Sequence, residues 1–243
     1  GKALASVSLL SATIKLEGSL ILQVQGDGPM HTLVAQADSQ GGVRGLARWQ
    51  GEVTHHNATL AELAGKGHIV MTVDAEGSER YQGIVELHEE SLAETLREYF
   101  LRSEQLPTRI WLASQDDLAA GLLLQKLPEG HGPEASWEHL VTLSDTITGG
   151  ELLELPFSDL LNRLYHQETV RLFDAEPVAF RCSCSREKIE RVLLGLGRQE
   201  VDSILEEEGE IRADCEFCLG KYRFDRVDVA ALFADAMPPS GRQ

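Results

Sequence analysis

The sequence is short of several residue types, and each shortage excludes a class of protein. The chain has 4 cysteines, and none lies in the first 181 residues. A secreted domain stapled by disulfides uses cysteine throughout, so this distribution favours a reducing compartment. No apolar run approaches the roughly 20 residues that a membrane-spanning helix needs, and no signal-peptide pattern opens the chain. We therefore expect a globular, cytoplasmic protein with no membrane partner.

Basic residues are scarce relative to acidic ones. The chain has 22 Lys and Arg against 39 Asp and Glu, a formal net charge of −17. Such a charge repels phosphate backbones, and no local basic stretch is long enough to offset it, so we expect no nucleic-acid partner. Catalytic patterns are also missing, because no nucleophile elbow occurs and the glycines at 26–29 lack the Lys-Ser/Thr ending of a P-loop. We interpret residues 26–29 as a plain turn.

Hydrophobic periodicity predicts an α+β fold, with a mainly antiparallel sheet and helical cover over residues 1–134. The 243 residues, 42% of them hydrophobic, are enough to bury a sizeable core and to form two domains. An opening helix carries the apolar residues Leu4, Val7, Leu10 and Ile14. Since this helical pattern begins at the first residue without a cap, we expect that a segment precedes Gly1.

Alternating apolar residues between turn signals predict the strands of this domain. We expect them at residues 19–25, 32–37, 43–49, 68–73, 80–87, 110–113 and 120–127. Ser91 and Glu94 have the spacing of a capping box, which predicts a helix through about Arg102. Pro107 ends that helix, because proline cannot continue a helical hydrogen-bond ladder.

From residue 135 to 179 the pattern is helical, and we interpret this part as a helical linker region. Its apolar faces include Trp137, Leu140, Phe157, Leu160, Leu161 and Leu164. Residues 180–235 then form a small C-terminal domain, and residues 236–243 form a tail. A domain below roughly 70 residues usually needs a disulfide or a metal for stability. We therefore expect a metal in the C-terminal domain.

The 4 cysteines lie in this domain as two pairs. Cys182 and Cys184 form a Cys-x-Cys pair, and Cys215 and Cys218 form a Cys-x-x-Cys pair. Two thiols from one turn and two from a distant turn complete a tetrahedron, the geometry that zinc prefers in structural sites. All 8 histidines precede Phe180. The sequence therefore predicts one zinc ion per chain, held by sulfur alone.

The spacing leaves the role of these cysteines open. One hypothesis is a structural zinc ribbon that serves as an adaptor or an enzyme accessory. A second is a regulatory site, because a disulfide within Cys-x-Cys closes a small, strained ring that is easily reduced. A third is a dithiol oxidoreductase that uses Cys215 and Cys218, since thioredoxin-like motifs share the Cys-x-x-Cys spacing.

Six stretches of the chain resemble the bacterial thirty-three-kilodalton heat-shock protein family of redox-regulated holdase chaperonins. They are Cys182-Ser183-Cys184-Ser185-Arg186-Glu187, residues 200–205, Cys215-Glu216-Phe217-Cys218, residues 25–29, Arg80-Tyr81-Gln82-Gly83 and residues 99–108. The similarity runs from the first predicted helix to the last. The family also carries an N-terminal segment before the position of Gly1, in agreement with the uncapped start.

The resemblance implies an ATP-independent chaperone and not an enzyme. In the reduced state it implies an inactive, zinc-bound monomer. Peroxide with heat, or hypochlorous acid, would release zinc and form the disulfides Cys182–Cys184 and Cys215–Cys218. The C-terminal domain and the linker would then unfold, and the active form would be a homodimer that binds unfolding client proteins.

Overall fold

The computed structural model describes residues 1–13, 17–51, 58–75, 77–87, 91–127 and 134–235. The chain divides into two compact units, Gly1–Arg181 and Cys182–Gln243. The predicted tail at 236–243 and the apolar Ile14 lie outside the described residues. Within the described part, no helix has both the length and the apolar character needed to cross a membrane.

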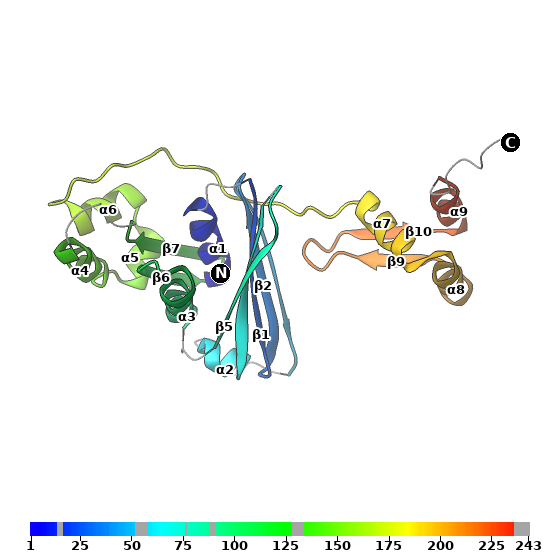
Figure 1. The fold of residues 1–243 in the computed structure, drawn as a ribbon, viewed down its shortest axis with the longest axis horizontal. Helices are drawn as coiled ribbons and strands as arrows, with labels where there is room; N and C mark the ends of the chain where they lie inside the picture. Colours follow the sequence, from blue (N-terminus) through cyan, green and yellow to red (C-terminus); the bar gives the residue numbers. More distant parts are fainter. Residues whose placement is uncertain (14–16, 52–57, 76, 88–90, 128–133, 236–243) are drawn as a thin grey trace. The chain divides into compact units, whose positions relative to one another are not determined.

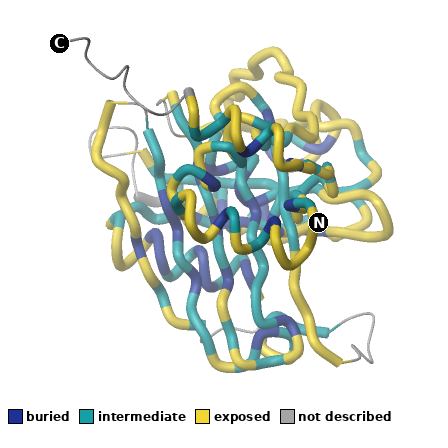
Figure 2. Tube along the Cα trace, turned by 90° about the vertical axis from the view of Figure 1, so that its right-hand side faces the viewer, coloured by how far each residue is buried: buried dark blue, intermediate teal, exposed yellow. Residues whose placement is uncertain are grey.

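The first unit contains a six-stranded sheet with the order β5-β4-β1-β2-β3-β8 (Figure 1). Its strands are β1 (Gly18–Gly26), β2 (Met30–Asp38), β3 (Gly42–Trp49), β4 (Gly67–Ala75), β5 (Tyr81–Glu86) and β8 (Ala179–Phe180). Neighbouring strands are antiparallel except β3 and β8, which are parallel. Leu20, Leu22 and Val24 alternate with less buried residues along β1, so the period-2 pattern marks the side facing the core (Figure 2).

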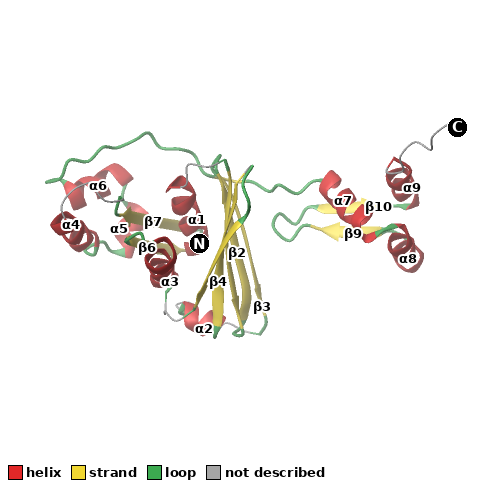
Figure 3. Cartoon of the chain, viewed as in Figure 1, coloured by secondary structure: helices red, strands yellow, loops and turns green. Residues whose placement is uncertain are grey.

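The last two strands predicted for this domain form a hairpin of their own. Strand β6 (Thr108–Gln115) pairs with β7 (Leu118–Gln125) and does not join the six-stranded sheet (Figure 3). Helix α1 (Lys2–Thr13) contacts β1, β2 and β3 of the sheet as well as β6 and β7 of the hairpin. The pattern of the strands did not predict this division, because periodicity marks the buried side of a strand and not its neighbours.

Helix α3 (Leu92–Tyr99) begins at the predicted cap, where the Ser91 side chain accepts a hydrogen bond from the backbone of Glu94. The helix continues as a π-helical turn, η1 (Phe100–Glu104). The Tyr99 ring lies against Gly83 of β5, where any β-carbon would collide with the ring. This close approach explains why a glycine stands in the strand.

Two short helices were absent from the prediction. Helix α2 (Leu60–Ala64) and helix α5 (Gly149–Glu154) each begin with a complete capping box. In the first, Thr59 and Glu62 exchange hydrogen bonds, and in the second Thr148 and Glu151 do so. Helices of one or two turns are too short to show a hydrophobic period, so only the cap spacing could have indicated them.

The helices of the predicted linker pack on the β6–β7 hairpin. Helix α5 contacts both strands, and α4 (Glu134–Ser144) contacts α6 (Phe157–Tyr165). Their shared core is formed by the buried residues Ala113, Leu152, Leu160, Leu164 and Tyr165. By these contacts the three helices belong to the first unit, and their role as a separate linker region stays a prediction.

The chain from residue 166 to 181 is exposed throughout. It contains large apolar side chains at Val170, Leu172, Phe173, Val178 and Phe180. Its end is attached to the sheet by backbone hydrogen bonds, from Ala179 N to Gly41 O at 2.9 Å and from Arg181 N to Val43 O at 3.0 Å. These two bonds hold the end of the segment against β3, while its apolar side chains remain exposed.

In its described residues, 182–235, the second unit contains three helices and one antiparallel hairpin. Its elements are α7 (Arg186–Leu196), α8 (Arg198–Glu208), β9 (Ile211–Asp214), β10 (Lys221–Phe224) and α9 (Arg226–Asp235). Its small core is formed by the buried residues Leu193, Val201, Leu205, Ile211, Phe224 and Val229. Gly209 ends α8 in the left-handed conformation, which glycine adopts without steric cost.

Candidate metal centre

The first two cysteines lie in an extended stretch directly before α7. Ser185 caps that helix, and its side chain accepts a hydrogen bond from Lys188 N at 3.3 Å. Cys184 therefore precedes a fixed helix start, and Cys182 lies two positions earlier. We call this stretch, with α7, the first cysteine arm.

The other two cysteines lie in the turn between β9 and β10. Cys215 N donates to Gly220 O at 2.8 Å, and Leu219 N donates to Cys215 O at 2.7 Å. Leu219 has a φ of 58°, in the left-handed region that non-glycine residues rarely occupy. These bonds fold residues 215–220 into a knuckle that brings both thiols to one side. We call this hairpin the second cysteine arm.

The two arms bring all four sulfurs together. The Sγ atoms of Cys182, Cys184, Cys215 and Cys218 lie within 4.8 Å of one another. Between the arms, Cys182 and Cys215 are 3.6 Å apart and Cys184 and Cys218 are 3.2 Å apart. A disulfide requires about 2.05 Å, and none of the four cysteines is joined to another by a disulfide.

These distances fit a tetrahedral metal site. Four sulfurs at about 2.3 Å from a central zinc ion would lie roughly 3.8 Å from one another. The observed spacing is close to that value, and thiolates are the soft ligands that favour zinc over magnesium or calcium. The residues present can therefore hold a metal ion.

The crowding of the four groups raises the pKa of one of the thiols. The hydrogen bond with Cys184 is the largest of several effects that raise the pKa of Cys218 to about 12. A hydrogen bond from its hydroxyl to Cys184 Sγ, at 3.2 Å, likewise raises the pKa of Tyr222 to about 12. A bound cation would instead lower the pKa of a thiol that coordinates it, because a coordinating thiol is deprotonated.

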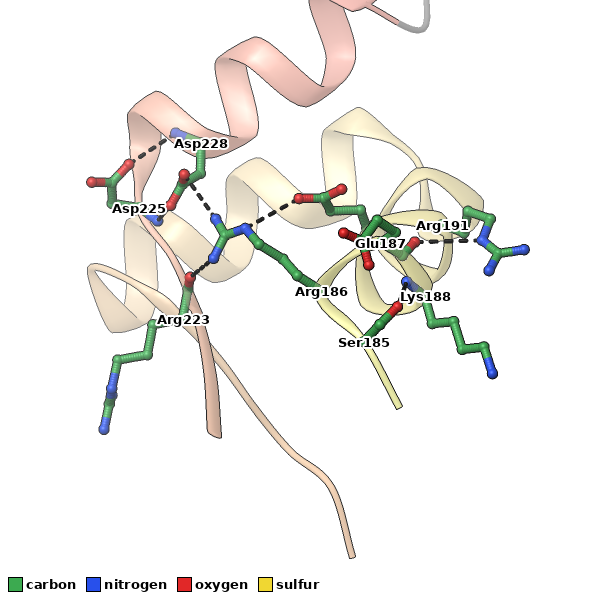
Figure 4. A network of polar contacts seen from close by, with 9 residues as sticks. Ser185, Arg186, Glu187, Lys188, Arg191, Arg223, Asp225 and Asp228 are labelled. Atoms are coloured by element: carbon green, nitrogen blue, oxygen red, sulfur yellow. Dashed lines mark hydrogen bonds and ion pairs between the residues drawn. The ribbon is translucent and has the colours of Figure 1, made fainter. Parts of the chain in front are cut away.

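Arg186 joins the first arm to the second (Figure 4). Its guanidinium lies 4.2 Å from the centre of the Phe224 ring and forms an ion pair with Asp228 at 2.8 Å. The pKa of Asp228 is lowered, first by a hydrogen bond from Asp225 and then by Arg186. Sequence reasoning found neither Arg186 nor Tyr222, although both lie within four positions of a predicted ligand.

The structure defines a two-unit protein, in which an α+β unit is followed by a small unit with four clustered thiols. Comparison with known proteins identifies the family. The family described as Hsp33 protein matches residues 1–225. The 33 kDa chaperonin of Nitrosococcus oceani is 53% identical over 235 residues, which cover 97% of this chain and 81% of that protein. The 33 kDa chaperonin of Shewanella loihica is 47% identical, with 97% of this chain and 82% of that protein covered.

A solved structure shows the same fold. The crystal structure of the 33 kDa chaperonin from Thermotoga maritima matches with a TM-score of 0.82 and 24% identity, over 97% of this chain and 84% of that one. The chain belongs to the Hsp33 family, a family of chaperones and not a class of enzymes. This confirms the predicted family and the predicted α+β fold with a cysteine-rich C-terminal part.

Proposed function

We propose that this chain is a redox-regulated, ATP-independent holdase chaperone that protects unfolding proteins from aggregation in the cytoplasm during oxidative stress. Membership of a chaperone family supports the general activity. The cluster of four thiols without disulfides supports the regulation, and it is the observation that carries the proposal. Residues 1–181 contain no cysteine, so this cluster is the thiol group on which an oxidant would act.

In the reduced state, Cys182, Cys184, Cys215 and Cys218 would hold one zinc ion per chain. When bound, zinc would supply the crosslink between the two cysteine arms, a contribution of roughly 10–16 kcal/mol in small zinc-dependent peptides. The core of the second unit has six buried apolar residues. A core of that size stabilises a domain weakly, so loss of the ligand set should unfold the unit.

Oxidation would remove that ligand set. Two molecules of hydrogen peroxide would take four electrons from the four thiolates and four protons from solvent, and would become four molecules of water. Two S–S bonds would form as the sulfur–metal bonds break. We propose the pairs Cys182–Cys184 and Cys215–Cys218. Bonds within an arm leave the two arms unconnected, so this oxidation would remove the crosslink that the metal had supplied.

Unfolding of the second unit would then loosen the end of the exposed segment 166–181, which the backbone of Ala179 and Arg181 attaches to β3, and with it the helices that precede the segment. The segment carries five large exposed apolar side chains, and Leu160 and Leu164 of α6 are buried in the core that includes Ala113 of the hairpin. Apolar surface of this extent binds the exposed hydrophobic groups of an unfolding client. The active form would be a homodimer, in line with the expectation from the family.

The proposal is tested by client aggregation in the absence of nucleotide. Light scattering from a thermally unfolding client is followed with reduced protein, and then with protein treated with peroxide at mild heat. We expect suppression only after oxidation, with reversal by a thiol reductant and zinc. Ser183→Ala is a matched control, because Ser183 is exposed between two proposed ligands and supplies no thiol.

Other outcomes decide against the switch. Equal suppression by reduced and oxidised protein, or suppression by neither, would favour a structural zinc ribbon that acts as an adaptor. Reduction of insulin disulfides that depends on Cys215 and Cys218 would favour the oxidoreductase.

A further inference from the structure

The Arg186 side chain contacts its own helix and two other elements of the second unit. It is the first residue of α7 and follows Cys184 by two positions. Its Nε lies 3.2 Å from Glu190 Oε1 on the same helix, its NH1 donates to the backbone oxygen of Arg223 at 3.0 Å, and its NH2 lies 2.8 Å from Asp228 Oδ1. Figure 4 shows these contacts converging from α7, β10 and α9.

The partners of Arg186 are themselves held in place. Phe224, under the guanidinium, is 1% exposed and belongs to the core of the second unit. Asp228 accepts from Asp225 N at 3.1 Å, while Asp225 accepts from Asp228 N at 2.9 Å. The ion pair therefore joins α7 to the capped start of α9 and not to a loose surface group. An interaction with fixed partners loses little conformational entropy when it forms.

These contacts connect the same two arms that the cysteines connect. Arg186 adjoins the Cys-x-Cys pair, and its partners Arg223 and Asp228 follow the Cys-x-x-Cys pair on β10 and α9. Without a metal or a disulfide, the sulfur atoms link the arms only through weak hydrogen bonds with one another and with the Tyr222 hydroxyl. The guanidinium joins them without either.

We propose that Arg186 is a positioning residue for the metal centre, which holds the two cysteine arms in register and sets how long the reduced protein retains zinc. The inference rests on the proposed zinc site and deepens its regulation. A centre whose arms stay aligned after one sulfur–metal bond opens can close that bond again. Weakening the Arg186 contacts should therefore let the metal leave sooner, under milder stress.

Lysine could not replace this arginine fully. A guanidinium presents a planar fork that can contact Glu190, Arg223 O and Asp228 together and stack on Phe224, whereas an ammonium is a single point charge. The Arg186 side chain is 41% exposed, so solvent screens the ion pair in part. Allowing for this screening, we expect loss of the Arg186 guanidinium to speed zinc release about tenfold. Loss of the Asp228 charge alone should speed it about threefold.

The test measures the rate at which the reduced, zinc-loaded full chain transfers zinc to an excess of chelator. Arg186→Gln, Arg186→Lys, Asp228→Asn and the double variant are compared with Arg191→Gln. Arg191 is the matched control, because it lies on the same helix and donates a 3.4 Å hydrogen bond to the backbone oxygen of Glu187 on that helix. Cobalt(II) absorption of each saturated variant shows whether four sulfurs still bind.

We expect Arg186→Gln to release zinc about tenfold faster than Arg191→Gln, with an unchanged cobalt spectrum. Arg186→Lys and Asp228→Asn should fall between them, and the double variant should match Arg186→Gln alone. Equal rates for Arg186→Gln and Arg191→Gln, or fully additive effects in the double variant, would overturn the inference. If Arg186→Gln does not fold, the Lys and Asn variants decide by the same comparison with the control. Wild-type protein that binds no zinc would instead refute the proposed metal centre, and the inference with it.

Discussion

Oxidation can pair the four cysteines in two ways, with opposite consequences for the second unit. Bonds between the arms would join Cys182 to Cys215 and Cys184 to Cys218, the pairs whose sulfurs lie 3.6 and 3.2 Å apart in the structure. Bonds within the arms would join Cys182 to Cys184 and Cys215 to Cys218. We expect the second pattern when reduced, zinc-loaded protein is treated with peroxide.

The free energy difference between the patterns follows from loop length. Bonds between the arms span 33 and 34 sequence positions. In the chain-entropy treatment a loop of that length stabilises the folded state by about 4 kcal/mol, whereas a loop of three or four residues contributes about 2 kcal/mol. Bonds between the arms would thus keep the two arms crosslinked after the metal leaves. Bonds within the arms would leave them unconnected.

The same entropy determines which bonds form. Once oxidation has opened the centre and the arms separate, thiols adjacent in sequence keep a high effective concentration. The advantage over the distant thiols is roughly 25-fold, from the ratio of the loop lengths. The short distances between the arms in the reduced structure depend on the folded unit, and we expect that unit to open as the ligands are oxidised.

Peptide mapping without reductant separates the two patterns. Trypsin cleaves after Arg181, Arg186, Arg212 and Lys221, which places each cysteine pair in a peptide of its own. Bonds within the arms give two separate peptides, each lighter by two hydrogens, and the helical circular dichroism signal should fall. Linked peptides together with an undiminished helical signal would refute the reasoning.

Three further predictions concern the metal and the first unit. Replacing Cys215 with Ser removes one proposed ligand, so the zinc content of reduced protein should fall from one ion per chain towards zero, while Ser183→Ala should retain it. Hydrogen exchange of residues 136–179 should accelerate after oxidation, and equal protection in both redox states would contradict the proposed release of this segment. Tyr222→Phe removes the hydroxyl that donates to Cys184 Sγ. Because a hydrogen bond to a charged group contributes about 1.5 kcal/mol, zinc transfer to a chelator should be about tenfold faster, and an unchanged rate would show that this bond does not stabilise the centre.

Local patterns in the sequence determined most of the secondary structure. Strands β1 to β5 were indicated by alternation between turn signals, and α3 by the Ser91 cap, because both signals arise from residues near one another in the chain. The two-residue strand β8 was not predicted, because it is too short to show any alternation. The cysteine spacing predicted a cluster of four thiols, since each pair lies within one turn. These features require no knowledge of distant contacts.

Tertiary structure alone decided how these parts are combined. The β6–β7 hairpin is separate from the sheet because α1 packs against both, a contact that no strand pattern encodes. Arg186 reaches Asp228, and Tyr222 reaches Cys184, across about forty positions of the chain. Side chains so far apart meet only when the helices and the hairpin of the second unit pack around one core. The sequence by itself therefore determined which residues can bind a metal, and the packing decided which other residues hold them in place.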